Sequence, residues 1–213
     1  MNDLQIVEVK FKKKRFYQFL KRVVDFFGAL VGLILLSWLM IILAILIKCT
    51  SKGPILYVSE RIGKNEKPFK FYKFRSMRVG ADAEVEQLMS QSEREGTFKM
   101  KNDPRVTKFG KFLRKTSLDE LPQLFNVLNG TMSIVGPRPV VQRELDLMDE
   151  YQRQRFLVKQ GITCIWQCSG RANTSFKEQI LMDLEYVNKR GFWYDVYLVL
   201  KTIPAVLLGK GSV

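Results

Sequence analysis

The feature that most constrains the fold of this chain is an uncharged hydrophobic run from Phe26 to Ile47. A helix that spans a bilayer needs about 20 consecutive apolar residues, so this run is long enough to be a membrane helix. It is longer than the apolar core of a signal peptide, and no small-residue cleavage site follows it. We therefore expect the run to remain in the mature protein as a membrane element.

Basic residues stand on both sides of this run. They are Lys10, Lys12, Lys13, Lys14, Arg15, Lys21 and Arg22 before it, and Lys48, Lys52, Arg61, Lys64, Lys67 and Lys70 after it. Because Lys and Arg stay on the cytoplasmic side of a membrane, a helix that crossed the bilayer would place one unfavourable flank outside. The pattern favours a re-entrant helix that enters and leaves on the cytoplasmic face. Hydropathy alone leaves an ordinary single-span anchor as the alternative.

The overall charge restricts the partners of the chain. Lys and Arg total 35 against 21 Asp and Glu, which gives a formal net charge of +14. So large a surplus indicates an anionic partner, such as nucleic acid, anionic lipid or a phosphorylated substrate. The three cysteines lie in unrelated contexts and the chain has no histidine, which disfavours a zinc site. Reduced thiols in a protein that faces the cytosol are expected.

The rest of the chain has a mixed pattern. Residues 55–58 and 69–74 are expected to form short strands, the second of them with a basic face that carries Lys73. An exposed helix is expected over 81–95. Apolar residues at helical spacing predict core-facing helices; they are Val141, Leu145, Met148 and Tyr151, and then Phe176, Ile180, Leu184 and Val187.

These elements predict a membrane-associated α+β chain in three parts. The parts are a basic N-terminal flank (1–22), a re-entrant hydrophobic helix (23–48) and a mostly helical cytoplasmic domain with a short β element (49–213). A final helix opens on the aromatic residues 192–194 and ends near Leu208. Aromatic residues beside an apolar, basic helix suit a membrane interface, and a C-terminal core helix is the alternative.

Two adjacent carboxylates, Asp119 and Glu120, are the best-placed candidates for chemistry. Without histidine, acid–base and nucleophilic steps must use carboxylates, Lys, Tyr, Cys or Ser. The cations Arg114 and Lys115 lie just upstream and favour ionised carboxylates. The same stretch also fits a capping box from Ser117 to Glu120, in a helix that ends at Gly130. These residues alone do not decide whether Asp119 and Glu120 mark the start of a helix or form a catalytic pair.

A longer set of motifs carries a family resemblance. The segments are Asp103-Pro104-Arg105-Val106-Thr107, Gly110–Arg114, Thr116–Leu124, Asn126–Leu128 and Met132–Pro139. In this order they closely resemble the bacterial sugar transferase domain, which defines the small monotopic phosphoglycosyl transferases. The likeness covers roughly Lys21 to Pro204.

The resemblance implies a reaction and its participants. A UDP-sugar would donate sugar 1-phosphate to a polyprenyl phosphate such as undecaprenyl phosphate, at the cytoplasmic face of the bacterial inner membrane. Asp119 would be the nucleophile and the ligand of a Mg²⁺ ion, UMP would leave, and Glu120 would orient the metal, Asp119 or the acceptor. The product would begin the assembly of a polysaccharide or glycoconjugate. Nucleic acid is not an expected partner, and a homo-oligomer is an open possibility.

Basic residues that match the family pattern are expected to bind the substrate phosphates. They are Lys73, Arg114, Arg138 and Arg171. The planar guanidinium of an arginine can bind two phosphate oxygens at once. Any one arginine in so basic a chain can equally be a solvated surface charge.

The chain departs from the family pattern at three places. The family commonly has Ser-Pro at the break of its membrane helix, whereas Trp38 follows Ser37 here. The break must then come from Ser37 bonding back to the helix, from nearby glycines or from outside contacts. Arg61-Ile62-Gly63 and Gln160–Cys164 also differ from the usual loops. Two other classes remain as alternatives: a membrane-tethered module that binds anionic ligands, and a catalytically inactive scaffold.

Overall fold

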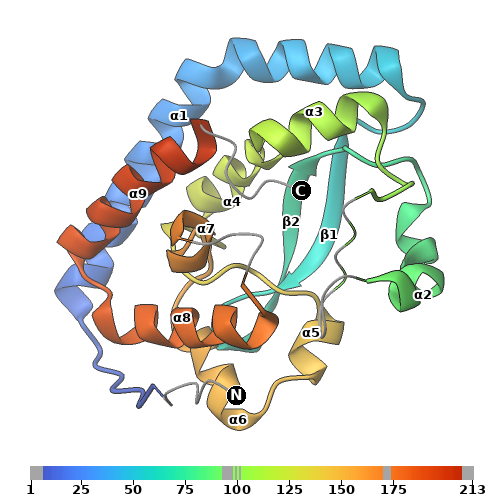
Figure 1. Ribbon diagram of the computed structural model, residues 1–213. Coiled ribbons are helices and arrows are strands. Elements are labelled where there is room, and N and C mark those ends of the chain that lie inside the picture. Colours follow the sequence, from blue (N-terminus) through green and yellow to red (C-terminus); the bar gives the residue numbers. More distant parts are fainter. Residues whose placement is uncertain (1–6, 93–97, 99, 101, 170–173, 208–213) are drawn as a thin grey trace.

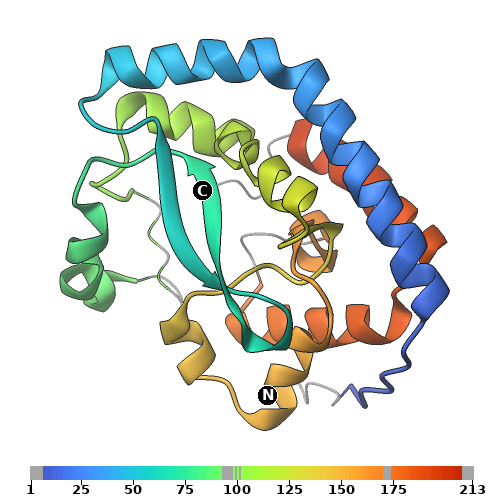
Figure 2. The same ribbon diagram turned by 180° about the vertical axis from the view of Figure 1, so that it is seen from behind.

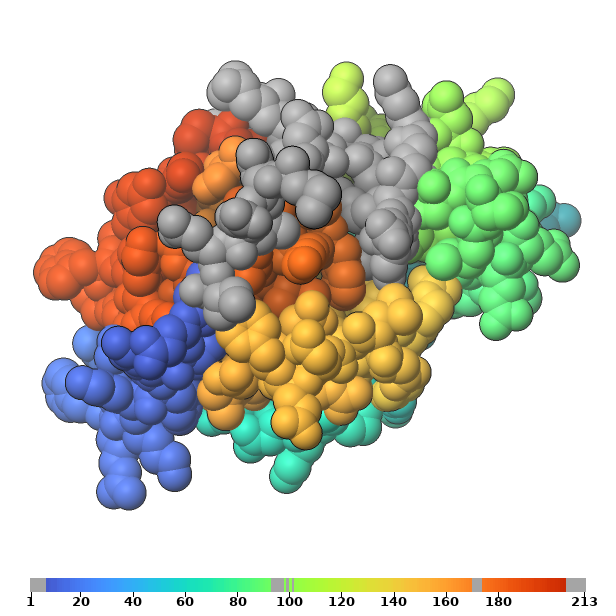
Figure 3. Space-filling model, turned by 60° about the horizontal axis from the view of Figure 1, so that its bottom comes forward, coloured from blue at the N-terminus to red at the C-terminus, as the bar shows by residue number. Residues whose placement is uncertain are grey.

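The computed structural model describes residues 7–92, 98, 100, 102–169 and 174–207 of the chain. Helices surround a β hairpin and a second pair of short strands, which confirms the predicted α+β class (Figure 1). Residues 7–14 precede the first helix and lie against the end of α8 (Phe176–Lys189), as Figure 3 shows from below.

Helix α1 (Arg15–Thr50) contains the hydrophobic run and changes direction sharply in its middle (Figures 1 and 2). Ser37 lies in this middle part, and its hydroxyl donates a hydrogen bond of 2.8 Å to the carbonyl of Ile34. A hydroxyl that bonds to the preceding turn can bend a helix that has no proline. This contact is the back-bonding that the sequence offers in place of the family's proline.

Both legs of α1 pack on the same globular body. Asp25 and Ala29 are buried on the first leg, and Leu43 and Ile47 are buried on the second. The outer surface of the helix is apolar and exposed; Trp38, for example, keeps 61% of its surface. Among the described residues, α1 is the one helix long and apolar enough to cross a membrane. Its bend leaves both ends against the same domain.

The hairpin consists of strands β1 (Leu56–Ile62) and β2 (Pro68–Phe74), which pair antiparallel with Leu56 opposite Phe74. Both predicted strands are confirmed, and the first runs further than expected. Their connection includes Lys64–Glu66, where Asn65 and Glu66 have positive φ. Aromatic side chains on β2 pack inward, since Phe71 and Phe74 are buried.

Helices α3 (Lys108–Thr116) and α4 (Gln123–Asn129) lie beside this hairpin (Figure 1). Between them runs a 3-10 turn, η4 (Leu118–Glu120). The predicted capping box is wrong: Ser117 adopts φ 57° and ends α3, and its side chain caps no helix. Gly130 ends α4 with φ 85°, as the sequence predicts. Strand β3 (Ser133–Val135) then pairs parallel with β4 (Gly161–Thr163).

The remaining helices are shorter than the sequence suggests, except near the C-terminus. The expected helix over 81–95 is a series of short turns around α2 (Val85–Leu88), as far as it is described. The apolar residues at helical spacing from Val141 to Tyr151 are divided between two short helices, α5 (Gln142–Asp146) and α6 (Glu150–Arg153). The second helix begins after Asp149, whose side chain caps it by accepting a hydrogen bond from the Gln152 amide. Helix α7 (Ile165–Ser169) follows β4.

Two C-terminal helices complete the core and the apolar surface. Helix α8 buries Ile180, Leu184 and Val187, as predicted. Helix α9 (Phe192–Leu207) lies beside the first leg of α1, to which Tyr17 and Lys21 tie it through Asp195 (Figures 1 and 2). Its Leu198 is buried, while an outward stripe is exposed: Trp193, Tyr197, Leu200 and Ile203. The helix therefore combines both expected characters, core packing and an apolar outer face.

Asn126 on α4 joins that helix to the hairpin. Its side chain is fully buried, accepts a hydrogen bond of 3.1 Å from the Tyr72 amide and donates one of 2.6 Å to the Lys70 carbonyl. Each bond satisfies a backbone group of β2 that would otherwise lack a partner. The residue therefore fixes the position of β2, and with it Lys73, relative to α4.

Asn126→Ala is expected to destabilise the fold by about 2 kcal/mol or more, because two backbone groups of β2 lose their partner. Thermal unfolding in detergent micelles, followed by circular dichroism, measures the effect as a lowered Tm. Gln87→Ala is the matched control, since Gln87 carries an exposed side-chain amide on α2 and its loss should change the Tm little. Equal Tm values for the two variants would contradict this role.

Candidate active site

Asp119 lies in the η4 turn between α3 and α4, and only 6% of its surface is exposed. The turn exists because Ser117 takes a left-handed conformation, which stops α3 and redirects the chain. Pro122 stands at the N-cap of α4, where a missing amide hydrogen costs nothing. The local sequence thus places a buried carboxylate on a short, rigid connection between two helices.

Glu120, the next residue, is paired with two cations from distant parts of the chain. Its Oε1 accepts hydrogen bonds of 2.9 Å from Lys73 Nζ and 2.9 Å from Arg138 Nη2. Lys73 Nζ also lies 3.5 Å from Asp119 Oδ2. Strand β2 supplies Lys73 and the loop after β3 supplies Arg138. The fold therefore brings four of the predicted site residues into one cluster.

The two carboxylates of this cluster differ in acidity. Burial raises the pKa of Asp119, the charge of Lys73 opposes this, and the charge of Glu120 raises it again. Burial also acts to raise the pKa of Glu120, but Arg138 and Lys73 together outweigh it and hold that pKa well below its usual range. Nearby cations, Arg114 among them, do act to lower the pKa of Asp119 as expected, but burial and the charge of Glu120 outweigh them. Glu120 is thus the fixed anion, and Asp119 is the more basic carboxylate.

The loop that carries Arg138 is held by close backbone packing. Gly161 donates a hydrogen bond of 2.9 Å to the Pro137 carbonyl, and a Cβ on Gly136 would lie only 2.2 Å from the carbonyl oxygen of Lys159. Arg155 donates a bond of 2.6 Å to the Arg138 carbonyl and forms a buried ion pair of 2.6 Å with Asp183. These contacts fix the direction from which the guanidinium reaches Glu120.

The other residues predicted for the site have different positions. Arg114 lies in the last turn of α3, and its charge acts to lower the pKa of Asp119, which places it near the pair. Arg171 lies outside the described residues. Ser37 and Trp38 lie at the bend of α1 and take no part in the cluster. Sequence reasoning did not identify Asn126 and Arg155 as supports of the site, because their roles depend on contacts between distant segments.

The cluster suits a hard cation only in part. Within the described part of the chain, no group of three or more Cys, Asp or Glu side chains could hold a metal ion alone. Mg²⁺ is, however, usually bound by one or two carboxylates together with substrate phosphates. Glu120 is already engaged by two cations, so Asp119 is the carboxylate with capacity for such an ion.

Comparison with known proteins identifies the family. The sequence model described as "Bacterial sugar transferase" matches residues 16–209, which is nearly the whole chain. This chain belongs to the bacterial sugar transferase family. The cluster of Asp119 and Glu120 therefore lies well inside the matched domain.

Several relatives of the chain have names that state an activity or a process. It is 44% identical over 194 residues to "Galactosyl transferase CpsE" of Streptococcus agalactiae, covering 90% of this chain and 43% of that protein. It is 41% identical over 204 residues to "Undecaprenyl-phosphate galactose phosphotransferase" of Salmonella typhimurium, covering 93% and 43%. It is 42% identical over 197 residues to "Exopolysaccharide production protein ExoY" of Rhizobium meliloti, covering 90% and 87%. The chain thus spans less than half of the first two relatives and most of the third.

Proposed function

We propose that this sugar transferase moves sugar 1-phosphate from a UDP-sugar to a polyprenyl phosphate, with release of UMP. The single observation that carries the proposal is the buried Asp119 carboxylate beside the Lys73–Glu120–Arg138 cluster. Relatives named as undecaprenyl-phosphate sugar phosphotransferases support the choice of substrates.

In the first step an oxygen of Asp119 attacks the phosphorus that bears the sugar. A bond forms between this oxygen and the phosphorus, and the bond to the bridging oxygen breaks, so that UMP departs with both electrons. The raised pKa of Asp119 makes its ionised form a stronger nucleophile than an ordinary carboxylate. Covalent catalysis of this kind divides one difficult displacement into two easier ones.

In the second step a phosphate oxygen of the polyprenyl phosphate attacks the same phosphorus and displaces Asp119. The products are a polyprenyl diphosphate sugar and the regenerated carboxylate. A phosphate monoester has a second pKa near about 6, so the acceptor is mostly dianionic at neutral pH and needs no strong base. Glu120 then acts by holding Lys73 and Arg138 in place for the diphosphate, rather than by removing a proton.

A magnesium ion bound to Asp119 and the donor phosphates would neutralise charge that develops on the leaving phosphate. Lys73, Arg114 and Arg138 supply fixed positive charge to the same phosphates. Arg171, which the sequence also suggests, is a fourth candidate for binding these phosphates.

The bent helix α1 suits a re-entrant membrane element in this proposal. Both of its legs pack on one globular body, and its outer surface and that of α9 are apolar. A helix inserted from one side would hold the active site near the headgroups, where the phosphate of a lipid acceptor lies. Basic flanks on both sides favour the cytoplasmic face of the bacterial inner membrane.

Lys73→Met is expected to shift the acid limb of the pH profile to higher pH by roughly 1–3 units. Asp119 must be ionised to attack, so activity falls as the pH drops through its pKa, and Lys73 lowers that pKa. Loss of the cation raises the pKa of Asp119 further, and activity then disappears at a higher pH. The profile of kcat/KM against pH measures this shift. An unmoved acid limb, or a shift also seen in the exposed neighbour variant Lys70→Met, would contradict the assignment.

The reaction class is tested by UMP release from a panel of UDP-sugars, with polyprenyl phosphate and Mg²⁺ in nanodiscs. UMP release that depends on the lipid and on one of the sugars is expected. Saturable binding of anionic ligands without release of UMP from any donor would favour the alternative of a membrane-tethered binding protein, which the charge of +14 also suits.

A further inference from the structure

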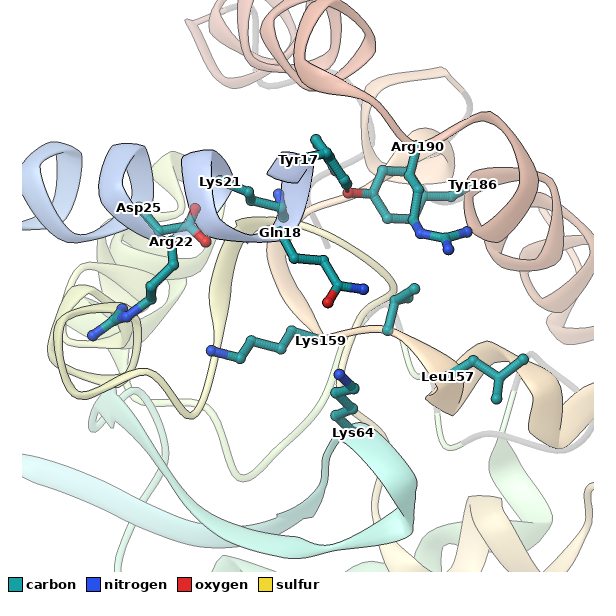
Figure 4. A pocket seen from close by; sticks show the side chains of 11 residues that line it. Tyr17, Gln18, Lys21, Arg22, Asp25, Lys64, Leu157, Lys159, Tyr186 and Arg190 are labelled. Atoms are coloured by element: carbon teal, nitrogen blue, oxygen red, sulfur yellow. Dashed lines mark hydrogen bonds between the residues drawn. The ribbon is translucent and has the colours of Figure 1, made fainter. Parts of the chain in front are cut away.

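A second basic site lies beneath the first turns of α1, away from the Asp119 cluster. It is a pocket of about 230 Å³ between α1, the hairpin connection, the segment before β4 and the end of α8 (Figure 4). Five of its lining residues are cationic and one is acidic; they are Lys21, Arg22, Lys64, Lys159, Arg190 and Asp25. None of the residues that line it belongs to the proposed catalytic cluster.

Three of the five cations already have firm partners. Lys21 forms an ion pair of 2.7 Å with Asp195, and Arg22 donates two hydrogen bonds to carbonyls at the end of α4. Arg190 donates to backbone carbonyls of Lys12 and Val187. These bonds hold the walls of the pocket in place, and Arg22 also fixes α1 to α4.

Two lysines in the pocket have no such partner. Across the described residues, the structure gives no hydrogen bond or ion pair to the side chains of Lys64 and Lys159. The same holds for the side-chain amide of Gln18. Figure 4 shows the Gln18 and Lys64 side chains extending toward one another from opposite walls, and the Lys159 side chain directed past them toward Arg22. The pocket's own carboxylate, Asp25, accepts a hydrogen bond of 2.9 Å from the Ile134 amide of β3, which lies outside the pocket lining.

The surplus charge affects the chemistry of Lys159. Burial lowers the pKa of its ammonium, the charges of Arg22, Lys64 and Lys21 lower it further, and Asp25 opposes them. Crowded cations with hydrogen-bond donors directed into one cavity are costly without a counter-charge. An anion with several acceptor oxygens would relieve this repulsion and accept bonds from both lysines and from Gln18.

We propose that this pocket binds a phosphate-bearing anion distinct from the substrates at the Asp119 site. The shared chemistry is a phosphate group, which can come from an anionic phospholipid headgroup or from free phosphate. Two exposed aromatic residues lie on the same turns of α1 as the pocket residues Tyr17 and Gln18: Phe16 and Phe19 keep 80% and 69% of their surface. Acyl chains could lie on these side chains while the headgroup occupies the basic cavity.

The pocket also contacts the support of the active site. Lys159 belongs to the segment whose backbone packs against Gly136, and Gly161 in that segment bonds to Pro137. An anion held by Lys159 would restrict this segment, and through it the loop that carries Arg138.

The test is thermal unfolding of the full chain in detergent, titrated with inorganic phosphate or with dihexanoyl phosphatidylglycerol at constant ionic strength. Ligands that bind the native state raise the Tm as their concentration rises. The variant is Lys64→Gln with Lys159→Gln. The control is Lys67→Gln with Lys177→Gln, two exposed lysines whose loss changes the net charge equally.

We expect the pocket variant to lose apparent anion affinity by at least about 10-fold, and the control to lose little. Without an added anion, the pocket variant should unfold at the same Tm as the wild type or higher, because two repelling charges are gone. Tighter binding of phosphatidylglycerol than of phosphate identifies a lipid headgroup, and the reverse identifies free phosphate. No stabilisation by either probe, or equal affinity in the two variants, overturns the proposal.

Discussion

Asp119→Asn is expected to abolish sugar phosphate transfer, with turnover reduced by at least about 10⁴-fold, as for other enzymes that lose a nucleophile. The amide has almost the same shape as the carboxylate but cannot attack phosphorus. The buried position of Asp119, 3.5 Å from Lys73, leaves little room for a substitute nucleophile or a free water. Release of UMP from the preferred UDP-sugar measures the loss.

The matched control for this variant is Asp146→Asn, which alters an exposed aspartate on α5. It should keep nearly full activity. A fold test belongs beside it: Asp119→Asn should unfold at the wild-type Tm or higher, because burial disfavours the charge of this carboxylate. Substantial UMP release by a folded Asp119→Asn protein would exclude Asp119 as the nucleophile.

Glu120→Gln is expected to lower kcat by about 10²-fold or more, through misplacement of two cations. Its Oε1 holds both Lys73 and Arg138 at 2.9 Å, and a neutral amide cannot balance two positive charges. The freed cations would bind the diphosphate or Asp119 in unproductive positions. KM for the UDP-sugar should therefore stay constant or fall while kcat drops.

The steady-state parameters of Glu120→Gln distinguish this positioning role from a role in substrate binding. Glu86→Gln, which changes an exposed glutamate on α2, serves as the control. A rise in KM with an unchanged kcat would contradict the positioning role, because it would mean that Glu120 contributes only to ground-state binding.

Sequence reasoning predicted the fold class because its strongest signals are local. The hydrophobic run, the basic flanks and the alternation on β2 each depend on neighbouring residues, and α1, β2 and α8 follow them. One local pattern failed because contacts with distant residues overrode it. The pattern from Ser117 to Glu120 satisfies a capping box, yet Glu120 reaches Lys73 and Arg138 instead, because two cations attract a carboxylate more strongly than one backbone amide.

The geometry of the site could not be predicted from the sequence in the same way. Lys73 and Glu120 are 47 positions apart, and their contact depends on Asn126, which bonds β2 to α4. Which of the two carboxylates has the higher pKa depends on burial, and burial cannot be read from the spacing of residues in the sequence. The basic pocket was missed for a related reason: Lys64 and Lys159 belong to unrelated motifs and meet only in the folded chain.

The most direct test of the central claim is the intact mass of the protein after brief mixing with its UDP-sugar and Mg²⁺, without lipid acceptor, followed by acid quench. The account predicts a mass increase equal to one sugar phosphate, located on the peptide that contains Asp119 and lost when polyprenyl phosphate is added. The adduct should be absent from Asp119→Asn. Rapid turnover by the wild type with no adduct at any mixing time, or an adduct on another residue, would contradict the mechanism.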